Sequence, residues 1–415
     1  MITEKKKTIM VGQSGGPTAV INASLYGVIK EGLDHPDKIS RIYGMIHGIE
    51  GLIHDDFMDL SETLTAEELE ILKTTPASYL GSCRYKLPDD LSSSLYPLIF
   101  QKLESLNVGY FLYIGGNDSM DTVSKLSCYG KQHNSDICFI GIPKTIDNDL
   151  ICTDHTPGYG SAAKYVASTV REIVLDASVY CQKSVTIVEI MGRHSGWLTA
   201  ASVLARKEAV DNPLLIYLPE ANFDFRQFSQ DVKAALDRQP NVIICISEGI
   251  SDHNGTFICE YGNTAGTDSF GHKMLTGAGK VLESYVRNQF GVKVRSVELN
   301  ISQRCSGMIV SLTDVEEAAQ AGREGMSAAL RGLSGKMISF KRTTSSTGEY
   351  CCNCTAEDVA KICNQEKSFP ADWIIRHGTD VSSEFTEYAL PLIYGEASRK
   401  MKQGLPVYLY RKTTR

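Results

Sequence analysis

The sequence predicts an α/β protein whose parallel sheets carry helices on both faces. Two observations lead to this prediction. A β-rich run, a loop containing glycine or Asp/Asn, and an amphipathic helix follow one another repeatedly, and such alternation is typical of parallel sheets. The chain has 415 residues, 42% of them hydrophobic and 22% charged, which is the balance of a globular protein with roughly two or three domains.

The repeated unit occurs four times in the first half of the chain. Its copies are KTIMVG–QSGGP–TAVINASLYGVIKEG, YFLYI–GGNDS–MDTVSKL, ICFIGI–PKTIDND with its helix delayed to GSAAKYVASTVREIVLDA, and SVTIVEI–MGRHSG–WLTAASVLARK. Further buried strands are expected in LLIYLPE, NVIICIS and VRSVELN. Parallel sheets bind ligands at the carboxyl ends of their strands. The loops of these units all follow a strand, so we expect the chemistry there.

The composition argues against two classes of partner. The formal net charge is -7, whereas nucleic-acid-binding proteins normally present a basic face, so no nucleic acid is expected. Apolar runs stay well short of the roughly 20 residues that cross a bilayer, so no membrane partner is expected. The N-terminal MITEKKKTIMVG lacks a signal-peptide cleavage pattern, and we expect a cytoplasmic protein.

The twelve cysteines are scattered, which favours reduced, packed thiols over disulfides. The exception is CCNC, formed by Cys351, Cys352 and Cys354 and followed by Cys363. It lacks the paired spacing of a zinc site, so we expect a plain loop. The surrounding stretch 339–358 is the most loop-like of the chain, and 251–272 is the second. Both are expected to be insertions or lids.

Two of the loops have features of a phosphate site. Gly15 and Gly16 end a strand and open a helix, whose free N–H groups and dipole favour a phosphate, although a tight turn without ligand is at least as compatible. In IGGNDSMD, the glycines occupy a similar turn. Asn117 and Asp118 follow them and are good helix caps. The carboxylate of Asp118 stands where a negatively charged ligand would come closest.

The loop PKTIDND combines groups that phosphoryl transfer needs. Thr145, Asp147 and Asp149 follow a strand, with Lys144 beside them. A hydroxyl that attacks phosphorus needs a carboxylate to take its proton, and a magnesium ion needs oxygen ligands. Spacing alone slightly favours an Asx-turn loop without such a role.

Further charged residues fall at other strand ends. Arg193 lies in MGRHSG and Glu220 in LPE, while a surface turn and a solvated strand end are the alternatives. Arginine suits phosphate recognition, although paired surface arginines are common. The remaining cations are Arg84 and Lys86 in SCRYK, and Arg295 and Arg304 in KVRSVELNISQRCSG. The cations of a net acidic protein thus share their loops with its carboxylates.

These segments together resemble the phosphofructokinase family. The matching motifs are SGG at 14–16, GGNDS at 115–119, PKTIDND at 143–149, MGR at 191–193, PE at 219–220 and QR at 303–304, in the family's order. The resemblance implies two Rossmann-like parallel-sheet domains with the active site in the cleft between them. It implies a donor and metal domain of 1–155 plus about 303–345. The sugar-phosphate domain would comprise about 156–302 plus 346–415.

The resemblance also bears on the phosphoryl donor. Members that use pyrophosphate carry aspartate and lysine where ATP-using members carry glycine, and this chain has Asp118 and Lys144 at those positions. It therefore implies Mg²⁺-dependent, reversible transfer from pyrophosphate to the C1 hydroxyl of fructose 6-phosphate. ATP as donor, sedoheptulose 7-phosphate as acceptor, and a non-catalytic sugar-phosphate sensor stay open as alternatives.

By position, the resemblance implies a role for each site residue. Asp147 would be the base, acting with Lys144 and Asp118. The pyrophosphate site would be Gly15, Gly16, Arg84 and Lys144. The sugar-phosphate site would be Thr145, Asp147, Met191, Gly192, Arg193, Glu220 and Arg304, with Arg295 from a neighbouring subunit. The metal would lie at Asn117, where the family has aspartate, and Asp118. A site shared in this way implies a homodimer or homotetramer.

Overall fold

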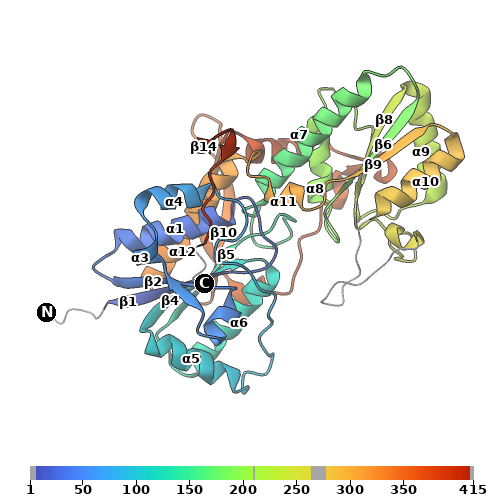
Figure 1. Cartoon of the computed structure of the whole chain (residues 1–415). Helices are drawn as coiled ribbons and strands as arrows, with labels where there is room; N and C mark the ends of the chain where they lie inside the picture. The colour runs from blue at the N-terminus through green and yellow to red at the C-terminus, as the bar shows by residue number, and fades with distance from the viewer. Residues whose placement is uncertain (1–5, 209–210, 263–276, 412–415) are drawn as a thin grey trace.

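The structure, a computed structural model, describes residues 6–208, 211–262 and 277–411. Figure 1 shows two units, each built around one sheet, with α7 running between them. The larger unit has a seven-stranded sheet in the order β11-β10-β5-β4-β1-β2-β3. Its strands are β1 (Lys7–Gln13), β2 (Ile39–Met45), β3 (Phe57–Asp59), β4 (Val108–Gly115), β5 (Cys138–Pro143), β10 (Lys336–Thr344) and β11 (Tyr350–Asp358). The two edge strands β3 and β11 run antiparallel to their neighbours, and the other pairs are parallel.

Helices cover both faces of the larger sheet. They are α1 (Ile21–Asp34), α2 (Ile49–Ile53), α3 (Leu60–Thr63), α4 (Ala66–Lys73), α5 (Leu95–Ser105), α6 (Asn117–Gln132) and α12 (Leu312–Leu330). Side chains alternate along a strand, so each strand of a buried sheet contributes to two cores. In β1, Ile9 and Val11 pack in the core beneath α1 and α12, whereas Met10 packs in the core beneath α5 and α6.

The smaller unit has a parallel sheet in the order β7-β8-β6-β9. Its strands are β6 (Ser184–Ile190), β7 (Leu215–Tyr217), β8 (Asn241–Ser247) and β9 (Lys293–Glu298). Its helices are α7 (Tyr159–Ser178), α8 (Trp197–Ala200), α9 (Phe225–Arg238), α10 (Ala278–Phe290), α13 (Ser383–Ala389) and the 3-10 turns η1 (Ala201–Ala205), η2 (Ile258–Tyr261), η4 (Ala371–Trp373), η5 (Arg376–Gly378) and η6 (Leu390–Ile393). A small ladder of β12 (Ile374–Ile375) and β13 (Asp380–Val381) lies beside them. The expected α/β class with two parallel-sheet units is confirmed.

The stretch 339–358 corrects one prediction. It forms most of the hairpin of β10 and β11, an antiparallel ladder from Lys336–Asp358 to Thr344–Tyr350, rather than a loop or lid. Polar residues are tolerated there because β11 is an edge strand whose outer side meets solvent. The CCNC motif therefore lies in a strand, with Cys352 and Cys354 packed against the core under α12. The second predicted lid, 251–272, falls partly outside the described residues.

The chain crosses between the units more often than expected, so the domain boundaries need correction. Strand β11, placed with the sugar-phosphate domain, belongs to the larger sheet. Residues 364–369, which we call the crossing segment, then lead from η3 (Val359–Lys361) to the smaller unit, whose core contains Phe369 and Phe385. The last residues return, with β14 (Met401–Lys402) and β15 (Leu405–Pro406) on the way, and Leu409 packs on the larger unit. Among the described helices, none has the length and apolar character of a membrane span.

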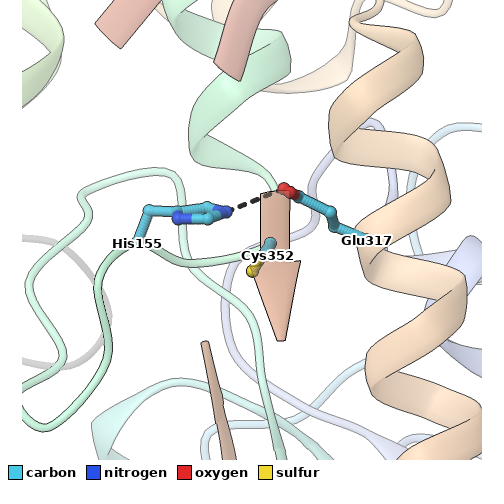
Figure 2. Close-up of side chains that lie close together, drawn as sticks. All are labelled: His155, Glu317 and Cys352. Carbon is cyan, nitrogen blue, oxygen red and sulfur yellow. Dashed lines mark hydrogen bonds and ion pairs between the residues drawn. The ribbon is translucent and has the colours of Figure 1, made fainter. Parts of the chain in front are cut away.

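A buried cluster of ionisable residues connects helix α12, strand β11 and the segment around residue 155 in the larger unit. The ligand atoms of His155, Glu317 and Cys352 lie within 4.8 Å of one another, as in a metal site (Figure 2). Both ring nitrogens of His155 are nevertheless hydrogen-bonded, Nε2 to Glu317 at 2.8 Å and Nδ1 to Asp154 at 2.8 Å. Burial lowers the pKa of His155, but the two carboxylates outweigh burial and the net shift is upward. The cluster is therefore better described as an imidazolium held between two carboxylates than as a metal centre.

The same cluster extends towards the smaller unit. Arg342 of β10 donates to both carboxylate oxygens of Asp154, through Nε and Nη2, and Nη2 also donates to the Tyr388 carbonyl at 3.0 Å. Tyr388 of α13 donates its hydroxyl to the Asp154 carbonyl at 2.9 Å. With His155 protonated, two cations offset two carboxylates, Asp154 and Glu317. A buried network with balanced charge is stable as a whole and sensitive to the loss of one member.

We expect His155→Gln to lower the free energy of unfolding by about 3–5 kcal/mol, because the buried Glu317 loses its cationic partner. Adding Glu317→Gln removes the unpaired charge, and the double variant should recover part of that loss. Urea denaturation of the wild type, both single variants and the double variant measures the coupling. Lys400→Gln, which breaks an exposed pair with Glu67, is the control and should change stability little. If the losses in unfolding free energy of the two single variants simply add in the double variant, His155 and Glu317 are not coupled.

Candidate active site

A cavity lies where loops of the two units meet. Its volume is about 350 Å³, and we call it the inner cavity. The loops after β1, β5 and β6 supply most of its wall. Its lining residues are Gly16, Pro17, Arg84, Lys144, Thr145, Ile146, Asp147, Asp149, Met191, Arg193, His194, Ser195, Glu248, Arg304 and Glu366. The strand ends of both sheets therefore contribute, as expected for ligand sites of parallel sheets.

A wider hollow of about 1000 Å³ adjoins the inner cavity on the side of the larger unit, and we call it the outer hollow. It shares Lys144, Asp147 and Asp149 with the inner cavity. It adds residues from the loops after β1 and β4 and from the SCRYK stretch. These added residues include Gly15, Lys86, Asn117 and Asp118. Two adjoining hollows with a common wall of cations and carboxylates can hold two substrates side by side.

Most of the residues predicted for the site meet there. Of the described residues that were expected at the site, three line neither hollow: Gly192, Glu220 and Arg295. Gly192 has φ +139°, and a side chain there would collide with the Ser195 carbonyl, so the loop requires glycine at this position. Its expected contact with the sugar phosphate stays a prediction. Arg295 is about half exposed on β9, 4.0 Å from Asp176, in a separate small pocket. Its expected contribution to a neighbouring subunit stays a prediction.

Lys144 ties the loop after β5 to the loop after β1. Its ammonium is buried and donates to the Gly16 carbonyl at 2.7 Å. Burial lowers the pKa of Lys144 to about 8, against the opposing attraction of Asp147 and Asp149. Gly15 has φ +77°, and a Cβ there would lie 3.1 Å from the Lys144 Nζ. A glycine at position 15 thus allows both the turn and the approach of the ammonium.

The two carboxylates of PKTIDND lie in the shared wall of both hollows. The hydroxyl of Thr145 faces the Asp147 carboxylate at 3.5 Å and accepts from the Asp147 N–H at 3.1 Å. Burial raises the pKa of Asp147, and the charge of Glu248 adds to it. Burial also raises the pKa of Asp149, and the charges of Asp147 and Glu366 add to it. These carboxylates repel one another, so the wall favours binding of a proton or a cation.

Asn148 holds the turn between these two aspartates. Its φ of +56° is left-handed, a conformation that asparagine tolerates better than most residues. Its amide donates to the Tyr388 hydroxyl at 2.8 Å and accepts from Lys367 at 3.4 Å. The loop is therefore supported from behind by residues late in the chain.

The structure corrects the helix-cap role expected of Asn117. Helix α6 is preceded by Gly116 as N-cap, so none of the polar residues of GGNDS caps it through its side chain. The Asn117 amide instead donates to the Gln365 carbonyl at 2.6 Å and accepts from the Asn364 N–H at 2.5 Å. Both ends of this side chain are therefore hydrogen-bonded to the crossing segment, and its expected place at the metal stays a prediction. Asp118 pairs with Lys86 at 3.0 Å at the exposed side of the outer hollow.

Glu220 has a supporting position. One carboxylate oxygen accepts from the Gly196 N–H at 2.9 Å and the Phe369 N–H at 3.0 Å. Burial raises its pKa. Through these bonds Glu220 joins the loop after β6 to the crossing segment behind the inner cavity.

Several lining residues were not expected from the sequence. Glu248 follows the buried strand NVIICIS, so the strand-end rule would have found it. His194 and Ser195 belong to the MGRHSG loop, of which only the first three positions were singled out. Glu366 lies in the crossing segment, far from any recognised motif, and has no local signal. Its place in both hollows results from the fold alone.

Comparison with known proteins gives consistent matches. The family described as phosphofructokinase matches residues 8–328. The chain is 37% identical over 397 residues to the pyrophosphate–fructose 6-phosphate 1-phosphotransferase of Halomonas elongata, covering 95% of this chain and 93% of the relative. It is 38% identical over 408 residues to the protein of the same name from Xanthomonas campestris, covering 97% and 96%. A sulfofructose kinase of Alkalicoccus urumqiensis is 33% identical over 335 residues, covering 80% and 83%.

A solved structure agrees with these matches. The crystal structure of the pyrophosphate-dependent phosphofructokinase from Nitrosospira multiformis superposes with a TM-score of 0.88 at 33% identity. The match covers 98% of this chain and 96% of that one. The fold is therefore shared over nearly the whole length of both chains.

Proposed function

The chain belongs to the phosphofructokinase family, and from this premise we propose that it transfers a phosphoryl group reversibly between pyrophosphate and fructose 6-phosphate. The products are phosphate and fructose 1,6-bisphosphate. The observation that carries the proposal is the common wall of the two hollows, in which Lys144 and Asp147 stand together. One hollow would hold the donor and the other the sugar phosphate, with the reacting groups meeting at this wall.

The outer hollow suits pyrophosphate as the donor. Lys144 and Arg84 line both hollows, and the Gly15–Gly16 turn lies near them. Helix α1 begins only at Ile21, and the Gly15 N–H donates to the Cys83 carbonyl, so the turn is not the helix start that the sequence suggested. Lys144 would stabilise the charge on the transferring phosphoryl and on the leaving phosphate. Asp118 lies further out, where the third phosphate of a nucleotide would extend. Its carboxylate would repel that group, while a donor of two phosphates ends short of it.

The inner cavity suits the sugar phosphate. Arg193 and Arg304 line it and are suited to a phosphate ester, and Met191 adds apolar contact. Asp147 would remove the proton of the C1 hydroxyl as that oxygen attacks phosphorus. Retention of this base beside two arginines and a lysine favours an enzyme over a sugar-phosphate sensor.

The residues of the common wall fit a magnesium ion. Asp147 and Asp149 line both hollows and offer the oxygen ligands that Mg²⁺ prefers. Their repulsion, which contributes to the raised pKa of Asp149, would be relieved by a divalent cation. When bound, the ion would neutralise phosphate charge and help to align the donor. Asp118 stays a further candidate ligand from the GGNDS loop.

We propose a homodimer or homotetramer as the working form. Arg295 lines a pocket separate from the inner cavity, which is compatible with a residue donated to a neighbour. Leu175, Val179 and Tyr180 lie near it at the end of α7 and are more than half exposed, with exposed fractions of 63%, 70% and 53%. Apolar side chains gathered in this way are typical of a protein interface.

The donor assignment predicts the effect of a double substitution. Asp118→Gly with Lys144→Gly should lower activity with pyrophosphate and relieve the block on ATP, because it removes both the repelling carboxylate and the donor-binding ammonium. Steady-state rates with each donor at fixed fructose 6-phosphate measure this change. Strong wild-type activity with ATP and none with pyrophosphate would contradict the assignment. Melting curves of wild type and variant show whether folding is intact.

The base assignment predicts that Asp147→Asn reduces kcat by about 10²–10⁴-fold, while fructose 6-phosphate still binds. In the wild type, kcat/KM should fall at low pH with an apparent pKa above the usual aspartate range, since the pKa of Asp147 is raised. At high pH it should fall with an apparent pKa near the Lys144 value of about 8. Stopped assays across pH and equilibrium sugar binding check both points. Asp136→Asn, in the exposed turn before β5, is the matched control. An unchanged kcat in Asp147→Asn would remove Asp147 as the base.

A further inference from the structure

The crossing segment is fixed to two motif loops of the site and to the smaller unit. Its first attachment is to the GGNDS loop, because the Asn117 amide binds the Asn364 N–H and the Gln365 carbonyl. These partners lie 247 and 248 residues from Asn117 in the sequence. The two bonds use opposite polarities of one amide, a donor and an acceptor. A carboxylate at position 117 could make only one of them, and would repel the Gln365 carbonyl.

The second attachment is to the PKTIDND loop. The Lys367 N–H donates to the Asp149 carbonyl at 2.6 Å. Its ammonium donates to the Asp154 carbonyl at 2.8 Å and the Thr153 carbonyl at 3.3 Å, and lies 5.0 Å from the centre of the Trp197 ring. Burial lowers the pKa of Lys367 to about 8. A long side chain held at several points fixes the backbone on either side of it.

The third attachment is to the smaller unit. The Phe369 N–H donates to Glu220, and the Trp197 indole donates to the Lys367 carbonyl at 3.3 Å. Phe369 itself is buried in the core of that unit. The crossing segment is therefore fixed immediately before and immediately after residue 366.

Glu366 is the residue between these fixed points. It is exposed on the segment, yet it lines both the inner cavity and the outer hollow, beside Asp147 and Asp149. The backbone at 364–365 and at 367 is hydrogen-bonded to other loops, so the side chain of Glu366 is directed to the common wall without a hydrogen bond of its own to the loops. The Glu366 carboxylate is therefore available to bind a ligand in either hollow.

We propose that Glu366 is a further active-site carboxylate that helps to hold the divalent cation of the metal–pyrophosphate complex, and that Asn117 is the positioning residue that keeps it in place. The inference rests on the proposed function. The GGNDS loop carries an amide at 117 instead of a carboxylate, and the segment bound by that amide supplies a carboxylate one residue further on. A carboxylate near the metal would thus come from the crossing segment instead of the start of α6.

Metal binding without turnover tests this proposal. Mn²⁺ serves as the probe, with methylenediphosphonate as a pyrophosphate analogue that cannot be cleaved, and free Mn²⁺ is counted by electron paramagnetic resonance. Glu366→Gln should weaken Mn²⁺ binding by about tenfold or more, by analogy with the loss of groups that support a metal site. Affinity for fructose 6-phosphate should be unchanged. Glu387→Gln, an exposed glutamate of α13, is the matched control and should bind Mn²⁺ as the wild type does.

A double-mutant cycle tests the role of Asn117. Asn117→Ala should weaken Mn²⁺ binding in the same direction, and Asn117→Ala with Glu366→Gln should be no weaker than Glu366→Gln alone, because Asn117 acts through Glu366. Additive losses would overturn the positioning role. Wild-type Mn²⁺ affinity in Glu366→Gln would overturn the role of Glu366. A wild type that binds neither Mn²⁺ with the diphosphonate nor fructose 6-phosphate would instead overturn the proposed function itself.

Discussion

The hydrogen bond from the buried Lys144 ammonium to the Gly16 carbonyl joins the loop after β5 to the loop after β1, and the site is organised around it. An ammonium taken out of water is costly unless negative charge lies near. Asp147 and Asp149 provide that charge, and their own repulsion is in turn reduced by the cation. The charged forms of Lys144, Asp147 and Asp149 therefore stabilise one another in the common wall. Gly15 leaves room for this approach.

Much of this arrangement could be predicted from the sequence because it follows a single rule. Loops after parallel strands meet at one edge of a sheet, so residues such as Lys144, Asp147 and Arg193 were expected to converge. The same rule covers Glu248, which was missed only because its strand end was not examined for charge. The hairpin of β10 and β11 was missed for another reason. An edge strand needs few apolar residues, and its threonines, serines and cysteines resemble a loop when read locally.

Other features could not be predicted, because long-range contacts decide them. Asparagine is a common helix-capping residue, but both ends of the Asn117 amide are hydrogen-bonded to the backbone of residues 364 and 365. Nothing near Glu366 marks it as a site residue, since its direction is set by bonds to loops hundreds of residues away. The cluster of His155 and Glu317 likewise has the composition of a metal site, and only the second hydrogen bond of the imidazole, to Asp154, identifies it as an ion network.

The place of the crossing segment in the chain has a consequence for biosynthesis. Every strand of the two main sheets has been synthesised by residue 358, before residues 364–369. The core of the smaller unit is completed later, because it includes Phe369 and Phe385. Until then the loops after β4, β5 and β6 lack the peptide that holds them together. The strands of both sheets are thus available before the peptide that completes the site, and the core of the smaller unit and the site are completed by the same late part of the chain.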